Sequence, residues 1–255
     1  MLSTTIAAQM YSIREFCKTP AKIAASVKKL AEIGYGAVQA SGLGPIAPAE
    51  LKKILDDNGV KCIATHTNTD RIQKDLAGLI AEHKALDCKY TAVGAMPESY
   101  RSAEGVVQYA QLMDKAGAAM RAEGVWLGYH NHSFEFEKYN GKLAMDLFYD
   151  NTSRQNVFAE IDTYWVQHGG GDPANWIRRF RNGMPVVHFK DLGVQNDKQV
   201  MLEVGEGNLN WGDIITACRE ANVEYFAVEQ DECNGLDPFD CLATSLRNLR
   251  NMGLE

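Results

Sequence analysis

Short apolar, β-prone runs alternate along the whole chain with longer amphipathic segments. The β-prone runs cover residues 4–9, 36–41, 61–66, 89–96, 125–132, 156–162, 184–190 and 224–230. This alternation is typical of βαβ units built on a parallel sheet. No shift in composition along the chain indicates a linker between domains. We therefore predict eight strands in one sheet.

The segments between these runs show helical periodicity. In the first of them Ile23, Val27 and Leu30 recur three or four positions apart, and Gly34 is placed to end the helix. Helices are predicted at 21–34, 49–59, 70–86, 103–122, 142–150, 173–182, 211–221 and 239–252. Eight such units in about 250 residues favour an α/β fold, a (β/α)8 TIM barrel forming a single domain over residues 1–255. A doubly wound open sheet is the alternative.

Polar side chains gather where the predicted strands end. These ends carry Gln9, Gln39, His66, Met96, His130 with His132, Asp162, His188 with Lys190, and Glu229. The beginnings and middles of the strands are mainly Val, Ile, Phe, Ala and Tyr. Because the chemistry of TIM barrels lies at the carboxyl ends of the strands, this pattern predicts a polar site at one rim.

Two carboxylates of the segment NVFAEID lie on one face of a strand. Glu160 and Asp162 are two positions apart, and we expect both in the barrel interior, with Phe158 and Ile161 packing elsewhere. Buried carboxylates are costly unless they are paired or bound to a cation. The sequence therefore predicts a buried positive partner for them.

Three rim residues offer ligands for such a cation. Asp162, His188 and Glu229 form a mixed oxygen and nitrogen set that suits one divalent ion, namely manganese, zinc, cobalt or magnesium. The alternatives are structural: Asp162 also fits a helix cap, and His188 also fits a core histidine. Lys190 shares the face of His188 and could pair with Glu160, Asp162 or Glu229.

The stretch GVWLGYHNHSFEFE, residues 124–137, places two imidazoles at the end of the fifth strand. His130 and His132 share one face, whereas Tyr129 and Asn131 point to the other. We interpret the histidines as acid or base groups. Gln9, His66, Glu135, Trp165 and Lys190 are the expected substrate contacts.

The composition of the chain limits the classes of binding partner that we expect. The 26 basic and 33 acidic residues give a net charge of −7, which disfavours binding to nucleic acid. The six cysteines form no CxxC pair and are interpreted as reduced thiols. No segment has the pattern of a signal peptide or of a membrane helix, so we expect a cytoplasmic protein without a membrane partner. The oligomeric state, including a homo-oligomer, stays open.

Six ordered motifs resemble the sugar phosphate isomerase/epimerase superfamily of xylose-isomerase-like TIM barrels. The motifs are AAQMYSIRE, YHNHSFEF, AEIDTYWVQHGGGDP, VVHFKD, GEGNLNW and AVEQD, and they span essentially the whole chain. The resemblance implies metal ligands at Asp162, His188 and Glu229, with a fourth from the fifth strand. Epimerases of this type have a glutamate there. In this chain either His130 or His132 ligates instead, or Glu160 takes that place.

The resemblance implies a metal-dependent sugar isomerase or epimerase of carbohydrate metabolism. Its substrate would be a small sugar, such as a ketose or an inosose, and the reaction a proton transfer next to a carbonyl. Glu229, His130, His132 and Glu160 are the expected catalytic residues. A metal-dependent lyase or hydrolase of keto-sugars and a sugar-binding barrel without catalysis are the alternatives. The charge and the histidine count disfavour an apurinic-site endonuclease.

Overall fold

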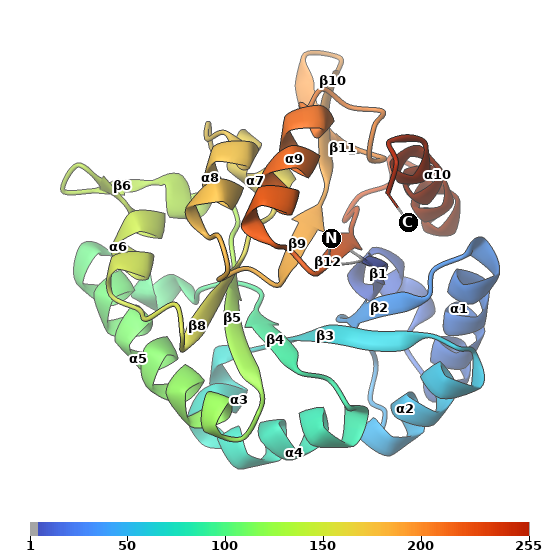
Figure 1. The fold of residues 1–255 in the computed structure, drawn as a ribbon, viewed down its shortest axis with the longest axis horizontal. Helices are drawn as coiled ribbons and strands as arrows, with labels where there is room; N and C mark the ends of the chain where they lie inside the picture. Colours follow the sequence, from blue (N-terminus) through green and yellow to red (C-terminus); the bar gives the residue numbers. More distant parts are fainter. Residues whose placement is uncertain (1–4, 255) are drawn as a thin grey trace.

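Eight parallel strands surround a central axis in the computed structural model, which describes residues 5–254 (Figure 1). In spatial order the sheet runs β8-β5-β4-β3-β2-β1-β12-β9. The strands are β1 (Thr5–Gln9), β2 (Ala37–Ala40), β3 (Lys61–Thr67), β4 (Tyr90–Val93), β5 (Trp126–His130), β8 (Val157–Glu160), β9 (Val186–Phe189) and β12 (Tyr225–Val228). The predicted single-domain (β/α)8 barrel is confirmed. Residue 4, the first of the predicted strand 4–9, lies outside the described residues.

The barrel closes between β8 and β9. The N–H of Ala159 donates to the carbonyl of Gly183 at 3.0 Å, and the N–H of His188 donates to that of Ile161 at 2.8 Å. Beyond the regular part of β8, Asp162 and His188 form an isolated parallel bridge. The seam of the barrel therefore runs through two of the predicted metal ligands.

Helices form an outer ring around the strands (Figure 1). They are α1 (Pro20–Ile33), α2 (Pro48–Asp57), α3 (Thr69–Lys74), α4 (Leu76–Leu86), α5 (Ala103–Ala122), α6 (Ala144–Asp150), α7 (Thr163–His168), α8 (Pro173–Arg179), α9 (Trp211–Ala221) and α10 (Pro238–Asn251). The described residues also form three short 3-10 helices, which are η1 (Met10–Phe16), η2 (Glu98–Tyr100) and η3 (Phe134–Phe136). Gly34 ends α1 with a φ of 111°, as its position in the sequence predicts.

The prediction of a single helix over 70–86 is wrong in one respect, because Asp75 interrupts the helix. The backbone of Asp75 is non-helical, with φ −149° and ψ 48°, and its carboxylate accepts the N–H of Gly78. An aspartate that caps the following turn competes with continuation of the preceding helix. The segment is therefore divided into α3 and α4.

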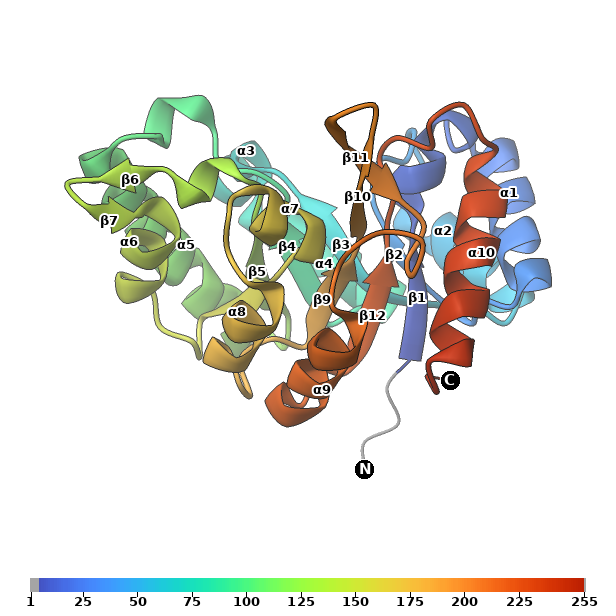
Figure 2. The ribbon, with the colours of Figure 1, turned by 90° about the horizontal axis from the view of Figure 1, so that it is seen from above.

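Two hairpins stand at the carboxyl end of the barrel, β6 (Lys138–Tyr139) with β7 (Lys142–Leu143) and β10 (Asp191–Gln195) with β11 (Lys198–Leu202) (Figure 2). The sequence did not predict either of them. The buried carboxylate of Asp191 holds the base of the second hairpin, because it accepts the backbone N–H groups of Gly205 and Gly207 and the indole N–H of Trp211.

An apolar layer fills the amino-terminal half of the barrel interior. Small side chains such as Ala64 and Ala227 leave room there for the rings of Tyr90 and Phe158. A Cβ on Gly128 would lie only 2.4 Å from the Phe158 ring, so a glycine is required for this packing. The expectation that Phe158 packs outside the interior is wrong: with a period of two it shares the face of Glu160. Ile161 does pack outside, against the helices.

Candidate metal centre

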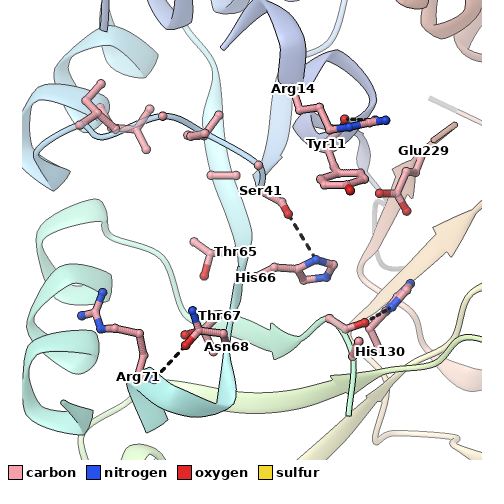
Figure 3. Close-up of a pocket in the computed structure, with 18 of the residues that line it drawn as sticks. Tyr11, Arg14, Ser41, Thr65, His66, Thr67, Asn68, Arg71, His130 and Glu229 are labelled. Atoms are coloured by element: carbon pink, nitrogen blue, oxygen red, sulfur yellow. Dashed lines mark hydrogen bonds between the residues drawn. The ribbon is translucent and has the colours of Figure 1, made fainter. Parts of the chain in front are cut away.

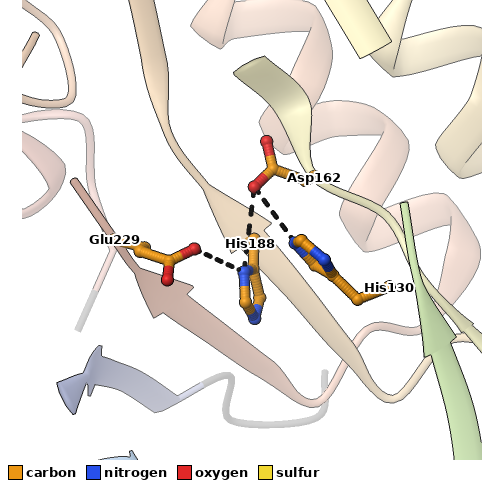
Figure 4. A group of neighbouring side chains, drawn as sticks. All are labelled: His130, Asp162, His188 and Glu229. Atoms are coloured by element: carbon orange, nitrogen blue, oxygen red, sulfur yellow. Dashed lines mark hydrogen bonds and ion pairs between the residues drawn. The ribbon is translucent and has the colours of Figure 1, made fainter. Parts of the chain in front are cut away.

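Four buried side chains converge at the carboxyl end of the barrel (Figure 4). His130 ends β5, Asp162 follows β8, His188 belongs to β9 and Glu229 follows β12. One nitrogen or oxygen from each lies within 4.8 Å of the others. The Nε2 of His130 is 3.3 Å from Oδ2 of Asp162, and the Nδ1 of His188 is 2.9 Å from Oε2 of Glu229. Two imidazoles and two carboxylates are a donor set suited to zinc or manganese.

Asp162 combines the two roles that the sequence left open. Its Oδ1 accepts the N–H of Trp165 at 2.9 Å and caps α7, while its Oδ2 faces the cluster. Its own N–H donates to Oδ1 of Asn131 at 3.1 Å. The cap therefore fixes the carboxylate orientation that turns the second oxygen toward the cluster.

Negative charge is in excess around the cluster. The Lys190 ammonium lies 3.2 Å from Oδ2 of Asp162, 2.9 Å from Oε2 of Glu229 and 2.8 Å from Oδ2 of Asp231. Burial opposes the charge of Lys190, but the Asp162 and Glu229 carboxylates outweigh it and raise the pKa well above its usual value. One ammonium faces three carboxylates, so the residues present fit a divalent cation. Asp231 is a site residue that the sequence analysis missed.

Glu160 lies behind His188 and not beside Glu229. The Nε2 of His188 is 2.8 Å from Oε1 of Gln39, and the Nε2 of Gln39 donates to Oε1 of Glu160 at 2.9 Å. The other oxygen of Glu160 is 2.7 Å from the Nε2 of His66. Glu160 is thus connected to the cluster through Gln39 and His188. The sequence analysis placed Gln39 at a strand end but gave it no role.

Glu160 and the histidines in contact with it stabilise each other's charged forms. Burial would raise the pKa of Glu160, but His188 and His66 outweigh it and lower the pKa to about 2. Burial would lower the pKa of His188, but Glu160 and Glu229 raise it to about 9. Glu160 is therefore ionised at neutral pH and holds the edge of the His188 ring that faces away from Glu229.

A cavity of about 1060 Å³ opens above the cluster (Figure 3). Of the predicted site residues, His66, His130, His132, Lys190 and Glu229 line it. Gln9, Glu135, Glu160, Asp162, Trp165 and His188 are not among its lining residues. Tyr11 and Arg14 of η1 also line the cavity, with the Arg14 guanidinium 4.4 Å from the centre of the Tyr11 ring. Both residues belong to the motif AAQMYSIRE, but no role was predicted for either of them.

Polar atoms without partners surround the cluster. Within residues 5–254, no hydrogen-bond partner is present for Nε2 of Gln9, Nδ1 of His132 or Nε1 of Trp165, although all three atoms are buried. The Trp165 and His132 rings lie 5.2 Å apart. Burial and the neighbouring His130 lower the pKa of His132 to about 3, so its imidazole is neutral.

Glu135 supports the strand end from outside the cavity. Its Oε1 accepts the Tyr129 hydroxyl at 2.5 Å, and its Oε2 accepts the N–H of His132 at 2.9 Å. Burial raises the pKa of Glu135 to about 7, although these hydrogen bonds favour the ionised form. The contacts of this carboxyl are therefore with the segment that carries His132.

The raised pKa of Glu135 predicts a stability that falls as the pH rises. The folded chain keeps a proton that an unfolded glutamate, with a pKa of 4.5, releases. The contribution of this proton to the free energy of unfolding is complete below pH 4.5 and is lost as the pH rises through 7. Relative to Glu135→Gln, the wild-type free energy of unfolding should fall by about 2–4 kcal/mol over this range. Urea denaturation at pH 4.5 and 8 measures it. Glu137 is exposed, so Glu137→Gln should change with pH as the wild type does. If the free energy of unfolding depends on pH equally in the wild type and in Glu135→Gln, the prediction is wrong.

The fold agrees with the comparisons to known proteins. Residues 27–252 match the model of the xylose isomerase-like TIM barrel family, so the chain belongs to that family. No curated protein sequence matches the chain significantly. Its fold is that of sugar isomerases and epimerases.

Three solved structures illustrate this likeness. A sugar phosphate isomerase/epimerase from Parabacteroides distasonis is 23% identical with a TM-score of 0.82, covering 97% of this chain and 98% of that one. An L-ribulose 3-epimerase is 15% identical with a TM-score of 0.71, covering 98% and 94%. A xylose isomerase-like TIM barrel protein from Mycobacterium smegmatis, in complex with magnesium, is 15% identical with a TM-score of 0.74, covering 98% of each chain.

None of the helices within residues 5–254 is both long and apolar enough to cross a membrane.

Proposed function

We propose that the protein is a divalent-metal-dependent sugar isomerase or epimerase that transfers a proton next to a carbonyl group. The observation that carries the proposal is the buried cluster of His130, Asp162, His188 and Glu229 beside a large cavity at the carboxyl end of the barrel. Active sites of this fold lie at that end. The magnesium complex and the epimerase among the similar structures are in keeping with the proposal.

The four residues of the cluster would hold the ion. His130 supplies the ligand from the fifth strand, because Glu160 lies on the other side of His188 and is bonded to Gln39 and His66. The ion, when bound, would stabilise negative charge that develops on the carbonyl and hydroxyl oxygens of the sugar. Glu160 and Gln39 then position His188, as residues behind a metal ligand commonly do.

Glu229 is the proposed base. It lines the cavity, and although burial opposes its charge, Lys190 and His188 hold its pKa well below the usual range, so its carboxylate is ionised. His132 lines the cavity as a neutral imidazole whose Nδ1 has no partner within residues 5–254, and its ring centre lies 5.0 Å from that of His130. The His132 imidazole would donate or accept the second proton, since the Nε2 of His130 faces the cluster and its Nδ1 lies 3.1 Å from the Gly94 carbonyl oxygen. His66 and Lys190, which line the cavity, would contact the hydroxyl groups of the sugar, whereas Gln9 and Trp165 do not line it.

The proposed proton transfer predicts isotope exchange with solvent. The enzyme, loaded with manganese and incubated in heavy water with candidate ketoses, inososes and 3-keto-sugars, should place deuterium on the carbon next to the carbonyl. Mass spectrometry of the recovered sugar measures it. If the active enzyme incorporates only oxygen-18 from labelled water, the proton-transfer proposal is wrong and the reaction is a hydrolysis.

A lyase is the second candidate, and the fifth strand favours it. This strand ends in His130, where an epimerase would have a second carboxylate. Glu229 could remove the proton while an imidazole protonates a leaving hydroxyl or alkoxyl group on the neighbouring carbon. The product would then be an unsaturated keto-sugar, which ultraviolet absorbance distinguishes from an isomer or epimer.

The cluster also predicts the metal content. About one divalent ion per chain should be present or readily taken up, because the four-residue cluster and the second candidate group of His66, Glu160 and His188 share the His188 imidazole. Elemental analysis and calorimetric titration with manganese, zinc, cobalt and magnesium measure it. Absence of binding at micromolar concentrations for all four ions would contradict the assignment.

A further inference from the structure

The cavity extends well beyond the cluster. Its volume of about 1060 Å³ reaches the upper end of the range for small-molecule pockets, about 300–1,000 Å³. Figure 3 shows Glu229 and His130 on one side, His66 and Ser41 between, and Arg71 on the opposite side. A single sugar ring bound at the cluster would leave this far part empty.

We call the far part the side lobe. It lies between the segment after β2, the helix α2 and the helices α3 and α4. Its lining includes Ile46, Pro48, Leu51, Arg71, Leu79 and Leu86. None of them belongs to the metal cluster. Leu51, Leu79 and Leu86 are only 3–7% exposed and face the lobe from α2 and α4. The side lobe therefore has a wall of apolar side chains beside the polar Arg71, Glu82 and His83.

The charged groups of the side lobe are already paired. Arg71 lies 3.0 Å from a carboxylate oxygen of Asp75 and 3.0 Å from one of Glu82. The buried His83 ring contacts the Thr65 hydroxyl at 2.7 Å. The lobe thus offers no uncompensated cation for a phosphate group. The Nε of Arg71 has no acceptor within residues 5–254, but it is buried and therefore not accessible from the lobe.

We propose that the substrate is a glycoside with an apolar, aromatic or alkyl aglycone that occupies the side lobe. The sugar ring lies at the cluster, and the aglycone packs against the leucines of α2 and α4. The position of the sugar ring rests on the proposed function. The side lobe accounts for the apolar side chains that line the cavity past His66, which a free sugar would leave uncovered.

Binding of phenyl β-glucopyranoside and of glucose to the manganese-loaded protein tests this proposal by titration calorimetry. We expect the phenyl glucoside to bind at least about tenfold tighter, since a small apolar group in a fitted pocket changes affinity by about 10–200-fold. Equal affinities, or no detectable binding of the phenyl glucoside, would overturn the proposal.

Two tryptophan variants locate the effect. Ile46 is half-buried in the loop before α2, so Ile46→Trp should fill the lobe without unfolding the chain. This variant should remove the preference for the phenyl glucoside and leave glucose binding unchanged. Ala49→Trp, at an exposed position of α2 that does not line the cavity, is the matched control and should keep the preference. A preference that survives in Ile46→Trp would place the phenyl group elsewhere and overturn the assignment.

The outcome is separable from that of the proposed function. The side lobe contains no predicted metal ligand, so the preference for the phenyl glucoside should persist after treatment with a chelator. Failure of metal uptake with a retained preference would remove the proposed chemistry and leave the lobe as a binding site. Metal uptake and isotope exchange without the preference would remove the lobe assignment alone.

Discussion

Glu229→Gln should lower turnover by about 10²–10⁴-fold, the range typical of a lost general base. The amide keeps the size of the side chain but cannot accept the proton. It also replaces the carboxylate oxygen that lies 2.9 Å from the His188 Nδ1 and 2.9 Å from the Lys190 ammonium. Steady-state rates at saturating manganese measure the effect, and isotope exchange should decline in parallel.

A neighbouring carboxylate provides the control for this variant. Glu232 also lines the cavity but is exposed, so Glu232→Gln should keep turnover within about the scatter of a surface substitution. A Glu229→Gln enzyme that is as active as wild type would exclude Glu229 as the base. If Glu229→Gln loses the metal along with its activity, Glu229 is a metal ligand. Its contribution to proton transfer is then given by the rate of the variant at saturating metal.

Removal of His188 should abolish metal uptake. His188 supplies the Nδ1 that faces Glu229, and its other nitrogen is fixed by Gln39. Without the imidazole, the binding site loses one of its four donors and the contact that orients it. We expect calorimetric titration of His188→Ala with manganese or zinc to show no binding at micromolar concentrations, while circular dichroism reports a folded barrel.

Two further variants separate metal binding from folding. His83→Ala removes a histidine that is equally buried but lies outside the cluster, so it should lose stability and keep metal uptake. Asp162→Asn keeps an oxygen to cap α7 but loses the charge that faces His130, and its metal affinity should fall about 10–100-fold or more. Normal metal uptake by His188→Ala together with a large loss of thermal stability would favour a structural role for His188.

Much of the site followed from strand ends alone. Polar residues after apolar runs indicated His66, His130, Asp162, His188 and Glu229, and the barrel brings all of them to one rim. This inference succeeds because parallel strands of a barrel end at the same rim. The position of Glu160 was harder to predict, since the alternation of side chains places it in the interior but does not say which neighbour it contacts.

The sequence by itself determined the eightfold alternation, the rim that carries the chemistry and the donor types of the candidate metal centre, because these depend on local periodicity and on residue identity. Only the tertiary structure decided that Gln39 connects His188 to Glu160, that Lys190 pairs with Asp231 and that leucines of α2 and α4 line the side lobe. Gln39 stands at a register shift between β2 and β3, next to Val38. A shift of one residue changes which side chains meet, and it depends on contacts between segments far apart in the chain, so local sequence cannot specify it.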